Sequence, residues 1–210
     1  NIEAEITIVE PKDYFELPFA QLRALVEPEN FAPSIRKPIH QLLPYVKHVK
    51  AQATRIKDET LILDDGSKLD YDFLVIATGS SFPSWPFLKG SESTIEARQE
   101  KYMIASEELK KADSIKIIGG GSVGVEFAGE IAWKWPEKKV RIYESGQRIL
   151  KSLDDKTAQR ALDILNELGV EVNTGERISK DAAESDGSLT YFAVGTKPNS
   201  SWIDEHSGLA

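Results

Sequence analysis

The sequence predicts an α/β protein in which two similar units each contribute a parallel sheet, and three observations support this class. Residues 115–144 read as a short apolar strand, a Gly-x-Gly-x-x-Gly loop, an amphipathic helix and a second strand that ends in an acid. A similar acid-tipped strand, residues 5–10, stands near the start of the chain. A strand-like run that ends at glycine occurs at residues 71–79, where we expect a buried strand, and it is repeated at residues 190–195. Strands that alternate with helices in this order favour parallel sheets with right-handed crossovers.

The glycine loop follows the apolar run that ends at Ile118, and it consists of Gly119, Gly120, Gly121, Ser122, Val123 and Gly124. The first glycine permits a tight turn, the third position lets the backbone approach a pyrophosphate, and the last lets the helix lie close to the strand. The helix N-terminus offers unpaired N–H groups and a positive dipole end to phosphates. We therefore expect these six residues to bind a dinucleotide. The alternative is a glycine-rich turn in an unrelated α/β protein, which the surrounding strand and helix pattern disfavours.

Glu144 ends the second strand of this unit, 20 residues after Gly124. An acid at this spacing binds the hydroxyls of a ribose and favours NADH over NADPH. A solvent-exposed acid at a strand end is the alternative. Arg141 and Arg148 are close enough in sequence to meet a 2′-phosphate, so the preference between the two nucleotides stays open here.

The remaining elements follow from hydrophobic periodicity and from residues that begin or end helices. We expect helices over residues 93–111, 123–135 and 153–168. Pro136 stops the second of these helices, Gly169 ends the third, and Ser152 or Asp154 caps its start. A strand is expected at residues 170–172. Between the units, residues 80–90 read as a linker.

Four aromatic residues of these segments have two readings each. Trp133 and Trp135 lie on or near the core-facing side of the second helix, and we expect them to pack rather than to stack on a cofactor. Trp85 and Phe87, with the intervening Pro86, form either an apolar rim for a lipid-like acceptor or an aromatic anchor for the linker.

Composition excludes several classes of function. The 26 Lys and Arg against 34 Asp and Glu give a net charge of −8, which argues against a nucleic-acid-binding surface. The chain has no apolar run of about 20 residues and no visible signal segment. It contains no cysteine, which excludes a redox disulfide, a thiolate nucleophile and cysteine-ligated metals. Its three histidines lack ligand spacing, so we expect no metal site.

The repeat of acid-tipped and glycine-ended strands suggests tandem Rossmann-like dinucleotide-binding units. We divide the chain into residues 1–82 as a partial first unit, 83–186 as an inserted second unit, and 187–210 as the return toward the first. The first copy has no glycine loop before Glu10, and it contains a proline-rich insertion. The second copy is shorter, since a strand expected between Ile178 and Gly187 is replaced by a polar stretch.

Together these segments resemble flavoproteins with two dinucleotide-binding domains, the pyridine nucleotide-dependent flavin oxidoreductases. The cysteine-free branch is the most similar: apoptosis-inducing-factor-like proteins, ferroptosis-suppressor-like quinone reductases and type II NADH dehydrogenases. The segments that support the resemblance are residues 8–16, 22–28, 71–80, 119–130, 136–140 and 194–199.

The resemblance implies FAD in the first unit, NAD(P)H in the second, and electron transfer from nicotinamide through flavin to a small-molecule acceptor such as a quinone. It implies that Glu10 holds the FAD ribose and that Gly79 lies beside the flavin-domain sheet edge. Gly195 begins a loop of the kind that lines ligand crevices, or else a simple turn. Glu126 matches the family's acid near the nicotinamide and is the candidate catalytic residue. Its alternative is an acid stabilised by the helix dipole, worth about 0.3–1 kcal/mol.

Two features of the resembling family are absent from the sequence: the FAD glycine loop and a C-terminal strand that ends in Gly-Asp. The sequence thus resembles the middle part of a longer flavoprotein. The alternative function is an NAD(P)-binding module or sensor without flavin turnover. The resemblance implies a cytoplasmic, mitochondrial or peripheral membrane location.

Overall fold

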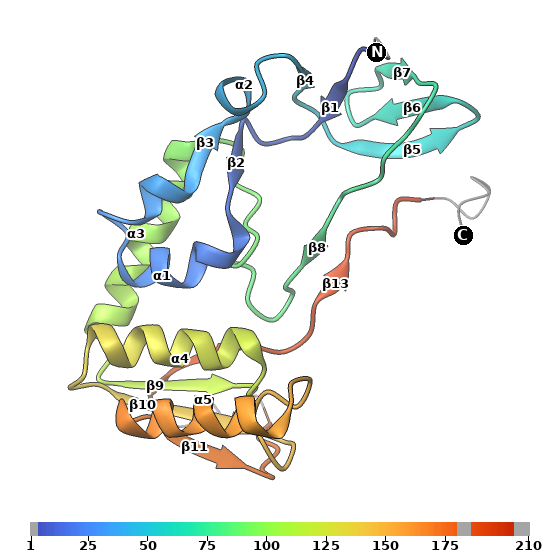
Figure 1. Ribbon diagram of the computed structural model, residues 1–210. Coiled ribbons are helices and arrows are strands. Elements are labelled where there is room, and N and C mark those ends of the chain that lie inside the picture. The colour runs from blue at the N-terminus through green and yellow to red at the C-terminus, as the bar shows by residue number, and fades with distance from the viewer. Residues whose placement is uncertain (1–3, 180–185, 204–210) are drawn as a thin grey trace.

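The computed structural model describes residues 4–179 and 186–203. Figure 1 shows two portions, with short strands at one end of the molecule and a helix-covered sheet at the other. Two extended segments run side by side between these portions. They contain β8 (Ser80–Ser81) and β13 (Lys197–Pro198), which pair antiparallel.

The second unit is a four-stranded parallel sheet, as the sequence predicts. Its strands are β9 (Ser114–Ile118), β10 (Lys139–Glu144), β11 (Glu171–Thr174) and β12 (Leu189–Phe192), in the order β11-β10-β9-β12. This is the order of a dinucleotide-binding half, with the glycine-loop strand inside the sheet. Helices α4 (Ser122–Lys134) and α5 (Asp155–Glu167) connect its first three strands. The predicted α/β class with parallel sheets is confirmed.

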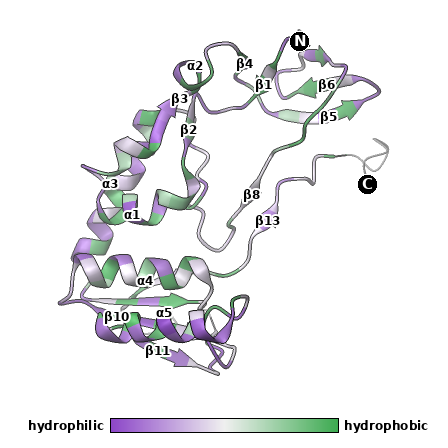
Figure 2. Cartoon of the chain, viewed as in Figure 1, coloured by the Kyte–Doolittle hydropathy of each residue, from purple (hydrophilic) through white to green (hydrophobic). Residues whose placement is uncertain are grey.

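The helices of this unit begin and end where local chemistry predicts. Asp154 is the N-cap of α5, and its carboxylate accepts the backbone N–H of Thr157 at 2.9 Å. Gly169 follows the helix with φ +79°, a left-handed conformation that favours glycine. α4 ends one residue before Trp135, which precedes Pro136. Figure 2, coloured by hydropathy, shows that β9 is mainly hydrophobic and that much of α5 is hydrophilic.

The core of the second unit lies between β9, β10 and the helices. Phe127 and Ile131 of α4 are fully buried, and so are Ile117 and Ile142 of the strands. Trp85 is also buried, and its ring centroid lies 4.7 Å from that of Phe127. The linker is therefore anchored by an aromatic side chain, one of the two readings of that segment. Trp133 differs from expectation: it is 56% exposed, because it lies on the side of α4 opposite Ile131.

The first portion contains short paired strands and short helices. β1 (Thr7–Val9) pairs parallel with β4 (Lys47–Val49), which confirms the acid-tipped strand before Glu10. Two further antiparallel groups are present: β2 (Tyr14–Glu16) with β3 (Arg36–Pro38), and β5 (Ala53–Lys57) with β6 (Thr60–Leu63) and β7 (Lys68–Asp70). The helical segments are η1 (Pro18–Ala20), α1 (Gln21–Val26), η2 (Ala32–Ile35) and α2 (Ile39–Leu42).

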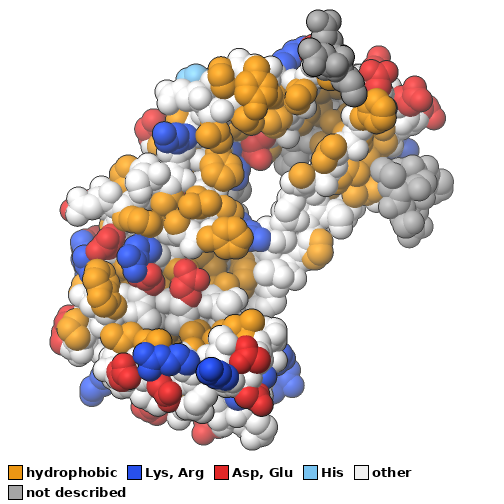
Figure 3. Space-filling model, in the orientation of Figure 1, with side chains coloured by type: hydrophobic (Ala, Val, Ile, Leu, Met, Phe, Trp, Pro, Cys, Tyr) orange, Lys and Arg blue, Asp and Glu red, His pale blue; other side chains and the backbone are white. Residues whose placement is uncertain are grey.

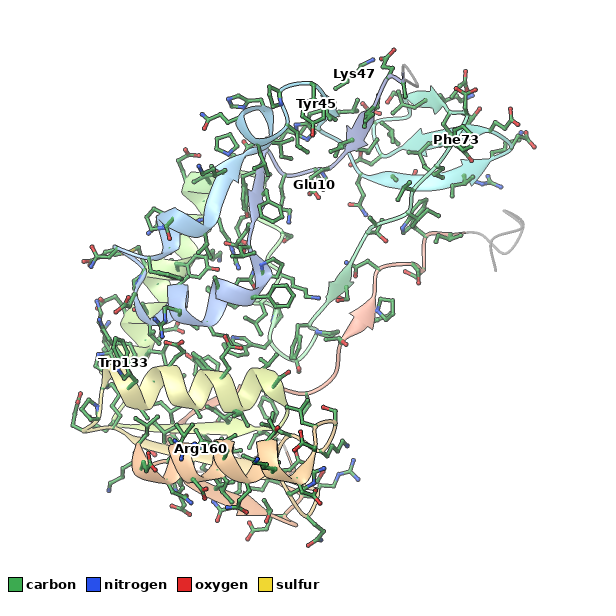
Figure 4. The ribbon with its side chains drawn as sticks, viewed as in Figure 1. Glu10, Tyr45, Lys47, Phe73, Trp133 and Arg160 are labelled. Atoms are coloured by element: carbon green, nitrogen blue, oxygen red, sulfur yellow. The ribbon has the colours of Figure 1, made fainter. Side chains whose placement is uncertain are left out.

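The segment 71–79, predicted as a buried strand, is extended but is not a strand of any sheet in the described residues. Leu74 and Ile76 pack against a small second core, whereas Phe73 and Val75 are 93% and 85% exposed. Figure 4 shows Phe73 beside the β5–β7 group. The prediction of burial was wrong, because burial on both faces requires neighbouring strands on either side and covering layers above and below. In the described residues these positions form backbone hydrogen bonds to other segments only at their ends, Tyr71 with Glu59 and Gly79 with Asn199.

Helix α3 (Ile95–Lys111) connects the two portions and contributes Arg98 to a buried ionic cluster. Thr94 caps this helix by accepting the Ala97 N–H at 3.2 Å. The Arg98 side chain has no exposed surface, and its guanidinium lies 3.1 Å from the Glu16 carboxylate and 3.2 Å from that of Glu92. The antiparallel strand pair β2–β3 is thereby tied to α3.

The proposed division of the chain meets one difference. Strand β12 pairs with β9, so the second sheet extends past the boundary placed at residue 187. The strand expected between residues 178 and 187 falls largely on residues 180–185, which lie outside the described residues. The division as a whole stays a prediction.

Candidate dinucleotide-binding site

The glycine loop turns directly out of strand β9 at Gly119. This residue has φ +117°, and its N–H donates to the Tyr143 carbonyl oxygen of the neighbouring strand at 2.8 Å. A Cβ atom at Gly119 would lie 2.7 Å from the carbonyl oxygen of Ala193, which follows β12. Conformation and space both require glycine, because the loop passes between the ends of three strands.

Gly124 and Gly120 are required for close packing within the unit. A Cβ atom at Gly124 would stand 2.0 Å from the Gly119 carbonyl oxygen, since α4 begins directly against the loop. At Gly120 a Cβ atom would stand 2.8 Å from Ile149 Cγ2. Neither contact can be relieved without moving the backbone or a packed side chain. The expected role of Gly124 in helix–strand packing is thus present in the geometry.

Gly121 is different, because a Cβ atom at this position would meet nothing within 4 Å. It is the N-cap residue of α4, and no side chain caps this helix start. The first N–H groups of the helix, those of Ser122 and Val123, therefore face an open surface at the positive end of the helix dipole. An uncapped helix start beside a side-chain-free residue fits the phosphates of a dinucleotide.

Glu144 lies against the loop at the end of β10. Its Oε2 accepts the Gly120 N–H at 2.7 Å, and its Oε1 accepts the Gly146 N–H at 2.7 Å. Partial burial acts to raise its pKa, but these two backbone N–H groups, with Lys151 nearby, hold the pKa below its ordinary value. The carboxylate is ionised and fixed in direction, and each oxygen keeps a further lone pair for a ribose hydroxyl.

Arg141 and Arg148, the two arginines that could favour NADPH, form hydrogen bonds to other parts of the chain. Arg148 donates to the carbonyl oxygens of Leu150 at 3.0 Å and Leu153 at 2.8 Å. Arg141 lies in the middle of β10, and its Nη2 donates to Ser114 Oγ at the start of β9 at 2.8 Å, away from Glu144. Neither guanidinium is placed to meet a 2′-phosphate at Glu144.

Glu126 lies one turn into α4, on the surface that faces α1. Partial burial of its carboxylate beside Glu130 raises its pKa, and Arg23 opposes this effect. Arg23 donates two hydrogen bonds to Glu130, from Nε at 3.1 Å and from Nη2 at 3.0 Å to the same carboxylate oxygen. This contact between α1 and α4 could not be predicted from the sequence, in which the one related signal is the spacing of two acids four residues apart on one helix.

Among the three remaining predicted residues, Gly195 lies next to the glycine loop, because it follows Val194, which lies against Gly119. Figure 4 shows Glu10 in the first portion of the molecule, away from α4, and its Oε1 accepts the Lys12 N–H at 3.1 Å. Gly79 and Gly195 both have positive φ, +67° and +74°, at the ends of the two connecting segments. The Gly79 carbonyl oxygen accepts the Asn199 N–H at 3.0 Å, which ties these segments together.

These positions test how well the chain fits each cofactor. For a pyridine dinucleotide, the loop, the helix start and the ribose acid lie together in one unit. For FAD, the residues of this chain supply one acid, Glu10, directly after β1. The residues present therefore form a complete dinucleotide cradle and only part of a flavin site.

The described part of the chain contains neither a metal-binding cluster nor a membrane-spanning helix. No group of three or more histidine, cysteine or acidic side chains is arranged there to hold a metal ion. Over the same residues, no helix has the length and apolar character that crossing a bilayer demands.

The fold and cradle define a dinucleotide-binding oxidoreductase architecture, and comparison with known proteins gives its family. The pyridine nucleotide-disulphide oxidoreductase profile matches residues 5–210, and the chain belongs to this family. The predicted family is confirmed, and so are FAD and NAD(P)H as the cofactors of that family. Since the chain has no cysteine, its 210 residues contain no redox disulfide.

Among its relatives is apoptosis-inducing factor homolog A of Dictyostelium discoideum, 36% identical over 203 residues that cover 93% of this chain and 48% of the relative. Ferroptosis suppressor protein 1 of Mus musculus is 30% identical over 173 residues, covering 82% of this chain and 46% of the relative. The chain thus spans about half the length of these relatives. The solved structure of NDH2 from Plasmodium falciparum in complex with NADH has the same fold, with TM-score 0.66 and 17% identity over 91% of this chain and 50% of that one.

Proposed function

We propose that this chain is the nicotinamide-nucleotide-binding part of an FAD-dependent NAD(P)H oxidoreductase that passes electrons to a quinone-like acceptor. The observation that supports this most strongly is the cradle formed by the uncapped start of α4, the side-chain-free surface at Gly121 and the oriented carboxylate of Glu144. Flavin, when bound, supplies the acceptor for a hydride from the nicotinamide.

Within this proposal, each part of the cradle has a defined task. The helix start binds the pyrophosphate, Glu144 binds the hydroxyls of the adenosine ribose, and Gly121 keeps the contact distance short. By its place in the family pattern, Glu126 is the residue expected near the nicotinamide end, one helical turn beyond the loop. Gly79 and Gly195 are proposed to shape the connections that bring the two units together.

We further propose a preference for NADH. An ionised carboxylate at the ribose would repel a 2′-phosphate, and both nearby arginines are bonded to other groups. Isothermal titration of the chain with NADH and with NADPH tests this preference. We expect NADH to bind at least about tenfold more tightly, a difference of about 1.4 kcal/mol. Tighter binding of NADPH, or no binding of either nucleotide, would refute the assignment of the cradle.

The electron-transfer part is tested on flavin-loaded protein. We expect NADH to bleach the visible flavin bands under anaerobic conditions and a short-chain quinone to restore them. Bleaching without restoration would exclude a quinone and point to another acceptor.

A second function, an NAD(P)-binding module without flavin turnover, is supported by one observation. The segment 71–79 of the first unit has no strand partner in the described residues. A purified chain that is colourless and binds NADH would favour this module. A yellow chain with stoichiometric flavin would exclude it.

A further inference from the structure

A groove runs along the outward face of α4, with α1 on one side and α5 on the other. Figure 1 shows the three helices in this order, and Figure 3 shows hydrophobic side chains along the seam between α4 and α5. The groove has a volume of about 290 Å³. The lining residues used below are Arg23, Glu126, Gly129, Glu130, Trp133 and Ile164.

The floor and walls of this groove are apolar where a surface helix is normally polar. Gly129 forms the floor, and a Cβ atom there would meet nothing within 4 Å, so the space above it is open. Trp133 lies one turn further along α4 and is 56% exposed, and Ile164 of α5 is 41% exposed. Large apolar side chains that gather around an open depression are typical of an interaction site.

The charges around the groove are matched, with one exception. Arg23 is held by Glu130 at 3.0 Å, and its guanidinium lies 5.4 Å from the centre of the Trp133 ring. Glu126 forms no hydrogen bond or ion pair with any of the described residues. One end of the apolar floor therefore presents a carboxylate that can accept a cation.

We propose that this groove binds an amphipathic helix of a partner protein that places a large apolar side chain over Gly129 and a lysine or arginine against Glu126. Glu126 and Gly129 are three residues apart on α4, which is about 4.5 Å along the helix axis. A partner helix presents residues at this separation when they are three or four positions apart. A helix seated between helices with such anchors is an established recognition mode.

Charge selects this partner over an anionic lipid surface. The chain has a net charge of −8, and the unmatched group in the groove is an acid. Such a field attracts basic segments and repels acidic headgroups. The groove is formed by helices without any cofactor, but it includes Glu126, which the proposed function places near the nicotinamide, so the test is run without nucleotide.

The test uses two fluorescent synthetic peptides of about 16 residues, long enough to form a helix. One is an amphipathic helix of leucine and lysine, and the other has glutamate in place of lysine. Binding to the intact chain is followed by fluorescence anisotropy at physiological salt. We expect the lysine peptide to bind at least about tenfold more tightly than the glutamate peptide.

Gly129→Leu locates the binding, because it fills the open space above the floor without a backbone clash. We expect this variant to weaken binding of the lysine peptide at least about tenfold and to unfold at a thermal midpoint no lower than that of the unmodified chain. Gly129→Ala, which adds only one methyl group, and Gln159→Leu, which puts a leucine on exposed α5 outside the groove, should bind within about twofold. Glu126→Gln should weaken binding of the lysine peptide and reduce the difference in affinity between the two peptides.

Three results would overturn the proposal. Equal binding by Gly129→Leu and the unmodified chain would place the peptide elsewhere on the acidic surface. Absence of binding by the lysine peptide would remove the basic helix as occupant. A dimer seen by sedimentation that Gly129→Leu dissociates would assign the groove to a second copy of the chain.

Discussion

Replacing Gly124 by alanine would place a methyl carbon 2.0 Å from the carbonyl oxygen of Gly119. Side-chain carbons essentially never approach other atoms closer than 3.0 Å, so α4 and the loop would have to separate by roughly 1 Å. This movement would loosen the fully buried Phe127 and Ile131 beneath the helix. Overpacking of this kind costs about 1–3 kcal/mol, and we expect the upper end because backbone lies on both sides of the contact.

The same substitution at Gly129 is the matched control, since it lies in the same helix. A Cβ atom there meets nothing within 4 Å, and alanine reduces the entropy of the unfolded chain. We therefore expect Gly129→Ala to stabilise the fold by about 0.4–1 kcal/mol. The two variants should change stability in opposite directions.

Thermal unfolding followed by far-ultraviolet circular dichroism is the assay. At about 2–4 °C per kcal/mol for a chain of this size, Gly124→Ala should lower the midpoint by about 6–12 °C, and Gly129→Ala should raise it by a few degrees. NADH affinity should fall only in Gly124→Ala. Equal midpoints for the two variants would refute the argument that helix–strand contact fixes glycine at Gly124.

Three further predictions concern charged groups. The pKa of Glu144 is lowered in the folded state, so its stabilising effect is present above the ordinary value of 4.5 and is lost as the pH falls through the lower folded value. The stability gap between the unmodified chain and Glu144→Gln should consequently shrink from pH 7 to pH 3 in urea titrations, and a constant gap would contradict this. Arg98→Met should cost about 3 kcal/mol in the same assay, the lower end for a broken buried pair, because the Glu16 carboxylate loses its nearest cation but keeps Arg36 at 4.0 Å and the Gln21 amide; a loss below about 1 kcal/mol would show that the ion pair is dispensable. A double-mutant cycle of Arg23→Gln and Glu130→Gln should give a coupling of roughly 0.2–1 kcal/mol that decreases with salt, and a salt-independent value would rule out an exposed ion pair.

The second unit could be predicted in detail because its signals are local. The Gly119 turn, the Asp154 cap and the Gly169 helix end each depend on a few neighbouring residues. The fourth strand, β12, follows from its apolar run and its final glycine. The first unit was less predictable, because the environment of residues 71–79 depends on what lies beside them.

Side-chain direction was the main source of error within the site. Trp133 lies on the side of α4 opposite Ile131, so helical position placed it at the surface. Arg148 is close to Glu144 in sequence, yet its guanidinium is bonded to carbonyl oxygens of the following turn. Sequence distance gives the reach of a long side chain but does not give the bond that it forms.

A strand, glycine loop, helix and acid in the order typical of a dinucleotide-binding unit could be recognised in the sequence, because each of these depends on backbone conformation over short stretches. The folded chain was needed to show that two N–H groups hold Glu144, that Arg141 and Arg148 are turned away from it, and that a groove opens above Gly129. These features depend on the packing of segments far apart in the chain, and packing is set by shape and partners that no local pattern contains.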